Sequence, residues 1–260
     1  MSRHASKLFA VPSLQDRLLS ILVSGTSSST TEIEITDLGC GNAGYWPTVL
    51  TKLLSARPSA QISLTLVDVN LNFALENKLL ASMSSPRVAL NFVEQGVSEF
   101  LERSPSANTI EERQSRLSAN YETRARFVVS FYLLEHLRKS DGWLALYSLD
   151  RFCHLEGADM SLIAVPTRFV YRAGAPDNSH NAHLSEWRPE DLRSANYRLL
   201  YGLDGSRLFK LRRLTESNSF VLRAFAGSVT KALVFLAPSL GLGGLYAKTG
   251  FPVPPGFNKA

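Results

Sequence analysis

Cysteine is scarce in this chain of 260 residues, where Cys40 and Cys153 are the whole complement. Two cysteines cannot form a disulfide framework or a cysteine-ligated zinc site, which favours a reducing compartment. The first fifteen residues also lack the apolar run of roughly 7–15 residues that a secretory signal requires. These absences predict a cytoplasmic protein.

A strong charge of either sign is lacking too, since 28 Lys and Arg residues face 23 Asp and Glu residues, a net charge of +5. This small excess favours acidic partners without identifying one. Hydrophobic residues make up 45% of the chain and charged residues 20%, which is enough apolar material for one substantial core.

Apolar patterning predicts strands that alternate with helices. Runs rich in β-branched residues predict five strands, at 33–36, 62–67, 88–93, 127–131 and 160–165. Helical spacing of apolar residues predicts helices at 14–23, 46–56, 71–82 and 140–155. This order is typical of the α/β class, and we expect a doubly wound, mostly parallel, Rossmann-like sheet that binds ligands at the carboxyl ends of its strands.

The chain divides into three regions. Residues 1–31 form a helical lead-in, residues 32–200 form the ligand-binding domain, and residues 201–260 form a C-terminal extension that we expect to be helical. A polar stretch at 104–126 has no apolar face, which indicates an insertion within the domain.

The extension is basic and then apolar over residues 208–246. Lys231 and Pro238 interrupt the apolar part, so it does not provide the roughly 20 apolar residues of a spanning helix. Packing over the sheet is the favoured role. Peripheral contact with the inner face of a membrane, through cations and apolar side chains, is the alternative.

Gly39, Gly41 and Gly44 give the pattern G-x-G-x-x-G between a predicted strand and a predicted helix. Such a loop brings backbone N–H groups close to a nucleotide, and its spacing fits dinucleotide and adenosyl cofactors alike. Asp37 precedes the loop. A carboxylate there would repel the pyrophosphate of a dinucleotide, whereas it would attract the cationic end of an adenosyl cofactor. Asp68 closes the second strand, where it can accept hydrogen bonds from ribose hydroxyls; a turn or helix-capping role is its alternative.

Three segments carry a resemblance to one family: Asp37-Leu-Gly-Cys-Gly41, Val67-Asp-Val-Asn70 and Leu134-Glu-His-Leu137. In these the chain resembles class I S-adenosylmethionine-dependent methyltransferases, over about residues 33–200. It departs from the family at Ala43, where the third glycine usually stands, and after the third strand, where Ser98 or Glu99 replaces the usual acid. The resemblance implies that S-adenosylmethionine is bound by Asp37, Gly39, Cys40, Gly41, Gly44, Asp68, Val69, Val97, Ser98, Ser130 and Phe131.

A further segment, His183-Leu-Ser-Glu-Trp187, resembles the H-x-S-x-W element of bacterial members of this family. Methyl transfer requires orientation and, for some acceptors, a base. His183 is the leading candidate for that base, with His136 and Glu135 beside it as further catalytic candidates. His180 and Trp187 are candidates for holding the acceptor.

Structural roles are the alternatives for these residues: Glu135 capping a helix start, Ser185 capping the next helix, and Trp187 packing. A metal is not predicted, because His180 and His183 lack a carboxylate partner at a fixed spacing.

The favoured function is O-methylation of a small-molecule or glycan-like acceptor, including lipid-linked ones. Nucleic acid is disfavoured, because the basic residues concentrate in the tail and the chain shows no RNA-binding module. A nicotinamide-dependent oxidoreductase is one alternative, against which Asp37 and the lack of a Tyr-x-x-x-Lys pattern argue. A non-catalytic cofactor-binding protein is another. Oligomeric state has no signature in the sequence.

Overall fold

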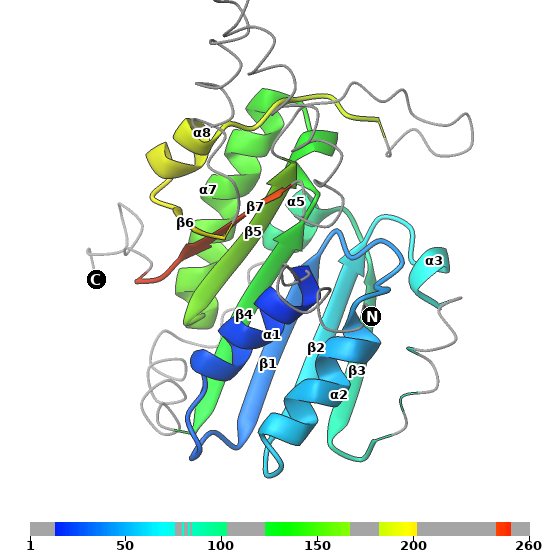
Figure 1. The fold of residues 1–260 in the computed structure, drawn as a ribbon. Coiled ribbons are helices and arrows are strands. Elements are labelled where there is room, and N and C mark those ends of the chain that lie inside the picture. The colour runs from blue at the N-terminus through cyan, green and yellow to red at the C-terminus, as the bar shows by residue number, and fades with distance from the viewer. Residues whose placement is uncertain are drawn as a thin grey trace, which may run out of the picture.

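The computed structural model describes residues 14–75, 80, 83, 85–102, 123–166, 182–201 and 243–250. Within them, seven strands form one sheet in the order β3-β2-β1-β4-β5-β7-β6 (Figure 1). The strands are β1 (Glu32–Leu38), β2 (Gln61–Asp68), β3 (Val88–Glu94), β4 (Arg124–Phe131), β5 (Met160–Pro166), β6 (Arg198–Tyr201) and β7 (Gly243–Lys248). β1 to β5 are parallel, and β7 runs antiparallel between β5 and β6.

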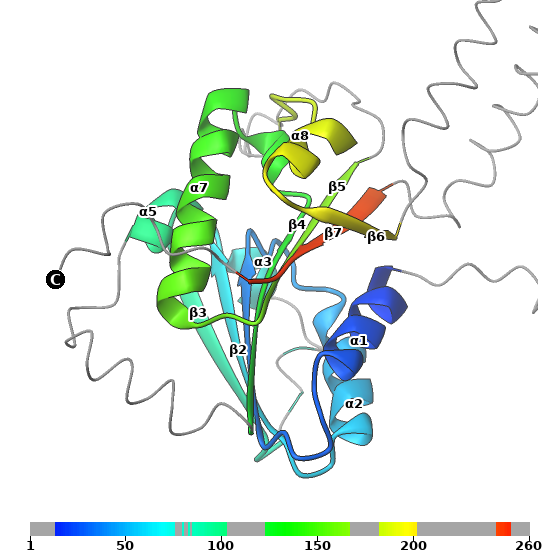
Figure 2. The same cartoon turned by 90° about the vertical axis from the view of Figure 1, so that its left-hand side faces the viewer.

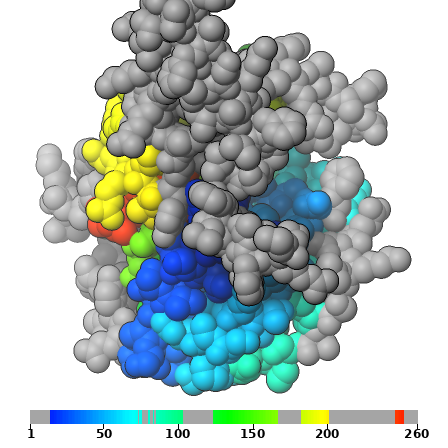
Figure 3. Space-filling view, in the orientation of Figure 1, coloured from blue at the N-terminus to red at the C-terminus, as the bar shows by residue number. Residues whose placement is uncertain are grey.

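Helices cover both faces of the sheet, as the edge-on view in Figure 2 shows. One face carries α1 (Leu14–Ser24) and α2 (Trp46–Ala56), whose atoms lie over its lower part in Figure 3. The other carries α5 (Val97–Glu102) and α7 (Lys139–Glu156), with α8 (Pro189–Ser194) at its upper end, while α3 (Asn72–Leu75) follows β2. The doubly wound, mostly parallel sheet expected from the sequence is therefore confirmed.

Each face has its own hydrophobic core, because the parallel strands bury side chains on both sides. Leu18, Leu22 and Leu50 are fully buried against one face. Leu146 and Leu149 of α7 are buried against the other. Among the described residues, we find no helix that combines the length and the apolar character needed to cross a membrane.

The strand order reverses at the centre of the sheet, between β1 and β4. From β1 the chain moves outward through β2 and β3, whereas from β4 it moves the other way to β5. Loops that follow β1 and β4 therefore diverge above their carboxyl ends, and ligands bind at such a switch point in open α/β sheets. The glycine loop after β1 lies at this point.

One boundary predicted from the sequence, the end of the insertion, is wrong. Arg124 and Arg126 were expected in the insertion at 104–126, but they begin β4. Their charges are accommodated at this end of the sheet because both pair with Glu34 of β1, with 2.6 Å between Arg126 Nε and Glu34 Oε2. The remainder of the insertion, 104–122, lies outside the described residues.

The helical C-terminal extension is also a wrong prediction for residues 243–248, which form β7. This strand is apolar because it lies between two strands, and Leu245, Tyr246 and Ala247 are all buried. Residues 202–242, which hold most of the segment proposed for membrane contact, lie outside the described residues.

Lys248 joins β7 to the helices packed beside it. Its side chain is 6% exposed, and its ammonium group forms an ion pair with Asp150 of α7. The same group donates a hydrogen bond to the carbonyl oxygen of Ala195, at 2.9 Å. A buried cation with two acceptors holds the strand to α7 and to the residue after α8.

We expect Lys248→Ala to lower the free energy of unfolding by about 3 kcal/mol or more, because it leaves a part-buried carboxylate without its cation. Lys52→Ala is the matched control, since Lys52 and Asp16 form an ion pair whose side chains are 50% and 46% exposed. That pair is worth less than about 1 kcal/mol. Urea unfolding of both variants measures the difference, and equal losses would contradict the role given to Lys248.

Candidate functional site

The glycine loop after β1 folds back on the end of β2. The backbone N–H groups of Gly39 and Cys40 donate to the carbonyl oxygen of Val67, at 2.8 and 3.2 Å. Gly39 and Gly41 have φ values of +72° and +53°, which side chains disfavour. The turn therefore requires glycine at both positions.

The two glycines differ in what surrounds them. A Cβ on Gly39 would lie 2.9 Å from Cδ1 of Leu133, so the loop contacts the segment that follows β4. A Cβ on Gly41 would meet no atom of the described structure within 4 Å. Gly39 thus provides a close approach between two loops, and Gly41 borders open space.

The third glycine position of the motif is occupied by Ala43, which adopts the left-handed conformation with a φ of +51°. Gly44 follows it without a positive φ, and its N–H donates to Oδ1 of Asn42 at 3.0 Å. Three positions of the loop, Gly39, Gly41 and Ala43, therefore have a positive φ.

Asp37, at the end of β1, is fully buried. Its Oδ2 atom accepts hydrogen bonds from the Tyr45 hydroxyl and from Nε1 of Trp46, both at 2.7 Å. Burial in an apolar setting raises the pKa of this carboxyl to about 6, against the two hydrogen bonds, which lower it. Asp37 thus joins the strand to the start of α2.

Asp68 ties the end of β2 to the glycine loop. Its Oδ2 atom accepts a hydrogen bond from the Gly41 N–H at 2.9 Å, and its Oδ1 atom accepts one from the Asn70 N–H at 3.1 Å. These contacts match the turn role that was the alternative for this residue. Each carboxylate oxygen keeps a second lone pair, so both oxygens can still accept from a ligand.

Polar atoms without hydrogen-bond partners gather at the carboxyl ends of the strands. In the described part of the chain four such buried atoms lie there: Asp37 Oδ1, Gln95 Nε2, Ser130 Oγ and Glu135 Oε2. Leaving a buried polar atom unpaired costs free energy, and such groups mark places where a ligand or ion completes the structure. The set fits a polar ligand bound at the switch point.

Gln95 is the member of this set that sequence reasoning missed. It directly follows β3, and only 7% of its side chain is exposed. The one signal for it in the sequence was its position directly after a predicted strand.

Three further residues expected to bind the cofactor, which are Val69, Val97 and Ser98, lie near Gln95 and differ in exposure. Val69 is 43% exposed after β2, and a Cβ on Gly96 would lie 3.9 Å from its Cγ1. Val97 is buried and Ser98 is exposed. Val69 and Gly96 thus form an apolar rim at this edge.

Cys40 and Phe131 lie within the loop region. Cys40 is buried, and desolvation raises the pKa of its thiol well above the usual range, so the thiol is neutral. The Phe131 ring is buried, with its centroid 5.6 Å from that of Tyr45. Both residues form the apolar floor beside Asp37.

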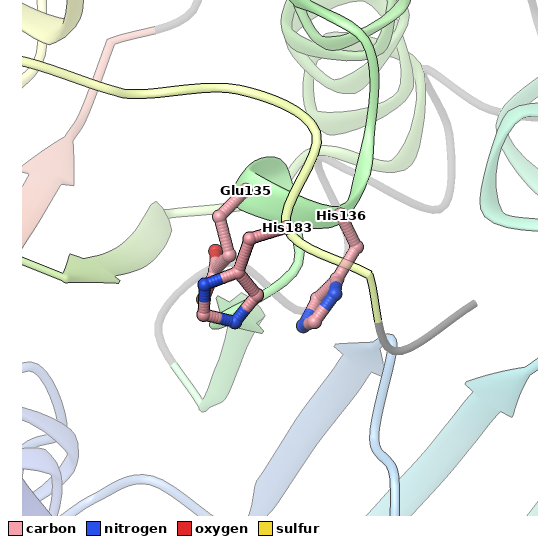
Figure 4. A group of neighbouring side chains, drawn as sticks. All are labelled: Glu135, His136 and His183. Carbon is pink, nitrogen blue, oxygen red and sulfur yellow. The ribbon is translucent and has the colours of Figure 1, made fainter. Parts of the chain in front are cut away.

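His183 lies beside Glu135 and His136 although it is distant from both in the sequence (Figure 4). Glu135 and His136 belong to the short 3-10 turn η2 (Leu134–His136) after β4. One ligand-type atom from each of the three residues lies within 4.8 Å of the others. Desolvation raises the pKa of the buried Glu135 carboxyl to about 7. The three candidate catalytic residues are therefore one cluster.

Hydrogen bonds dock the segment of His183 onto η2. The N–H groups of Leu184 and Ser185 donate to the carbonyl oxygen of Glu135, at 2.7 and 3.2 Å. The Ser185 hydroxyl and Nε1 of Trp187 donate to the carbonyl oxygen of Leu134, at 3.1 and 2.9 Å. Ser185 is used here rather than as a cap of α8, whose N-cap is Arg188.

The Trp187 side chain is buried against α7. It is 5% exposed, and its ring lies so close to Gly142 of α7 that a Cβ there would be 2.3 Å from Cζ2. The Lys139 ammonium group lies 3.8 Å from the ring centroid. Trp187 thus anchors the segment of His183. His180, the other candidate for holding the acceptor, lies outside the described residues.

Known proteins resemble this chain in structure but not in sequence. No protein-family model and no curated protein matches the sequence. Phosphoethanolamine N-methyltransferase 2 of Haemonchus contortus, solved with S-adenosyl-L-methionine, aligns over 94% of this chain at 14% identity and a TM-score of 0.45. The chain spans 54% of that protein's length.

The cyclopropane synthase MmaA2 of Mycobacterium tuberculosis aligns over 90% of this chain and 84% of its own, at 11% identity and a TM-score of 0.42. Similarity at this level assigns neither a family nor an activity. The assignment of activity therefore depends on the chain's own residues.

We expect Asp37→Asn to stabilise the protein without ligand above pH 6. The pKa of this carboxyl is raised from 3.8 to about 6 in the folded state, so its contribution to stability is full below pH 4 and is lost as the pH rises to 6. Asparagine still accepts from Tyr45 and Trp46 but does not ionise, and the gain at pH 7 is at most about 3 kcal/mol. Urea unfolding between pH 4.5 and 7.5 measures it; a gain that does not grow with pH contradicts the assignment.

Proposed function

We propose that this protein is an S-adenosylmethionine-dependent methyltransferase that acts on a small-molecule or glycan-like acceptor, with an oxygen as the methylated atom. The observation that carries the proposal is the group of unpartnered buried polar atoms around the glycine loop at the switch point of the sheet. S-adenosylmethionine supplies an electrophilic sulfonium methyl group, so the protein needs to orient two reactants rather than to form a covalent intermediate.

The donor side of the site is formed by the ends of β1, β2 and β4. Asp37 would face the amino group of the methionine moiety, because its Oδ1 atom is buried without a partner among the described residues. Asp68 would accept from the ribose hydroxyls through its second lone pairs. Val69, Val97 and Ser98 would flank the adenine ring, with Gln95 Nε2 as a donor that the sequence did not suggest.

Gly41 would lie under the cofactor, since open space surrounds the position of its missing Cβ. Cys40, Gly39 and Ala43 then define the path of the loop. Ser130 and Phe131 would complete the wall after β4, where the Ser130 hydroxyl is buried without a partner in the described structure.

The acceptor side is the cluster of Glu135, His136 and His183. In the metal-free protein His183 is the proposed base: it takes the proton of the acceptor hydroxyl while the oxygen attacks the methyl group and S-adenosylhomocysteine leaves. Trp187 and Ser185 keep His183 in place through their hydrogen bonds to Leu134. Contact of residues 208–246 with a membrane surface would suit a lipid-linked acceptor and belongs to the same proposal.

Gly41→Ala tests the cofactor site against a matched control. Gly41 and Gly250 have φ values of +53° and +65°, and for neither does an atom of the described residues lie within 4 Å of the position of a Cβ. Alanine costs each turn a similar strain of about 1–2 kcal/mol. We expect Gly41→Ala alone to weaken S-adenosylmethionine binding, by at least tenfold, because Gly250 lies after β7 at the opposite end of the sheet.

Calorimetry with S-adenosylmethionine, S-adenosylhomocysteine and NAD measures this binding in both variants and in the parent protein. Binding of NAD without either adenosyl ligand would establish the oxidoreductase alternative. Equal affinity of the two glycine variants for S-adenosylmethionine would remove the loop from the site.

His183→Gln tests the acceptor side through transfer of a labelled methyl group into an extract of small molecules and glycans. General bases contribute about 10²–10⁴ in rate, so we expect kcat to fall at least 100-fold with an unchanged affinity for S-adenosylmethionine. His154→Gln, on α7, is the control and leaves the rate unchanged. Full activity of His183→Gln would refute its role, and adenosyl binding without any transfer by the parent protein would favour the non-catalytic alternative.

A further inference from the structure

The cluster of Glu135, His136 and His183 has the composition of a transition-metal site. It offers one carboxylate and two imidazoles, with one ligand-type atom from each within 4.8 Å of the others. The His136 and His183 ring centroids are 5.0 Å apart, and Figure 4 shows the three side chains directed to a common space. Sequence reasoning set a metal aside for want of a carboxylate near His183, and the fold brings one from η2.

The His136 ring is oriented as metal-binding imidazoles are. Its Nδ1 atom lies 3.0 Å from the carbonyl oxygen of Ala182. A carbonyl oxygen only accepts, so Nδ1 carries the proton and Nε2 carries the lone pair. A backbone carbonyl that fixes the tautomer in this way is a common outer contact of histidines that bind metals.

Glu135 gives an independent indication of a missing ligand. The residue is 3% exposed, and its Oε2 atom has no hydrogen-bond partner in the described part of the chain. A buried carboxylate oxygen without a donor is costly, and a cation beside it removes that cost. The carbonyl oxygen of Glu135 already accepts from Leu184 and Ser185, so Oε2 is the atom of this residue that lacks a partner in the described structure.

The frame that holds the cluster is rigid. Four hydrogen bonds from residues 184–187 end on the carbonyl oxygens of Leu134 and Glu135. Both segments that carry the three side chains are therefore fixed relative to each other before any ligand binds. Preorganisation of this kind reduces the cost of forming a metal site.

We propose that Glu135, His136 and His183 bind one divalent transition-metal ion of the zinc class. Ligand atoms in a tetrahedral zinc site lie about 3.4 Å apart. Side-chain rotations that move each ligand atom by about 1 Å therefore suffice to bring the three residues to that spacing. Three protein ligands leave at least one position open, which an acceptor oxygen would occupy. Magnesium and calcium are disfavoured, because they prefer oxygen ligands to imidazole.

The metal ion would change the chemistry of the acceptor side. A coordinated hydroxyl group has a lowered pKa, so it would release its proton to solvent water before the oxygen attacks the methyl group and S-adenosylhomocysteine leaves. In that state His183 serves as a ligand instead of a base. Metal binding itself does not depend on methyl transfer, so the two proposals fail separately.

The test is calorimetric titration of Zn²⁺ into the full chain after treatment with EDTA, with Co²⁺ as a second probe whose visible absorption reports imidazole ligands. We expect one zinc per chain, and a fall in affinity of at least about tenfold in Glu135→Gln and in His183→Gln. Glu135→Gln keeps the size of the side chain, and its thermal unfolding without metal checks that it is folded. His154→Gln is the matched control and binds zinc as the parent does.

Binding of Mg²⁺ in place of Zn²⁺, or an absence of zinc binding by the parent, would overturn the proposal. It would also be overturned if Glu135→Gln and His183→Gln bound zinc with the parent's affinity while His180→Gln did not. Zinc binding that is lost in both cluster variants supports the site, whether or not methyl transfer is detected.

Discussion

The hydrogen bonds that Tyr45 and Trp46 donate to the Asp37 carboxylate hold the carboxyl edge of the sheet together. They fix where β1 ends and where α2 begins, so the glycine loop between them has both of its ends defined. One carboxylate oxygen is used for this structure, and the other is buried without a partner in the described residues. The protein thus carries a buried charge whose cost a cationic ligand would relieve, which makes the same residue a support of the fold and a reason for binding.

Patterns among neighbouring residues predicted the strands, the helices and the glycine turn, which depend mainly on local interactions. The five parallel strands and the helices at 46–56 and 140–155 follow from apolar periodicity, and Gly39 and Gly41 adopt the backbone conformations that their motif requires. β7 was missed because an apolar strand enclosed by two others has no alternation of polar and apolar residues to distinguish it from a helix. Arg124 and Arg126 were missed because their charges are balanced by Glu34, on a strand far away in the sequence.

The cluster beside the glycine loop could be predicted in its members but not in its assembly. His183 and Glu135 were each chosen as candidates from their own segments, and no spacing in the sequence connects them. What brings them together is a set of hydrogen bonds to backbone carbonyl oxygens of Leu134 and Glu135. Every residue has a carbonyl oxygen, so these contacts leave no trace in the sequence. Gln95 could not be predicted as a site residue either, since its amide is uncharged and forms no pattern with its neighbours that indicates a binding role.

The contact between Trp187 and Gly142 has an evolutionary consequence. The indole ring occupies the space that a side chain at position 142 would need, so a glycine in the first turn of α7 is tolerated despite its cost to the helix. A relative with a smaller residue at position 187 could place alanine at position 142 and regain helix stability. A tryptophan at position 187, by contrast, leaves no room for a side chain at position 142. The two positions should therefore covary among relatives. That paired signal would trace the docking of the histidine segment even in lineages whose acceptor chemistry has diverged.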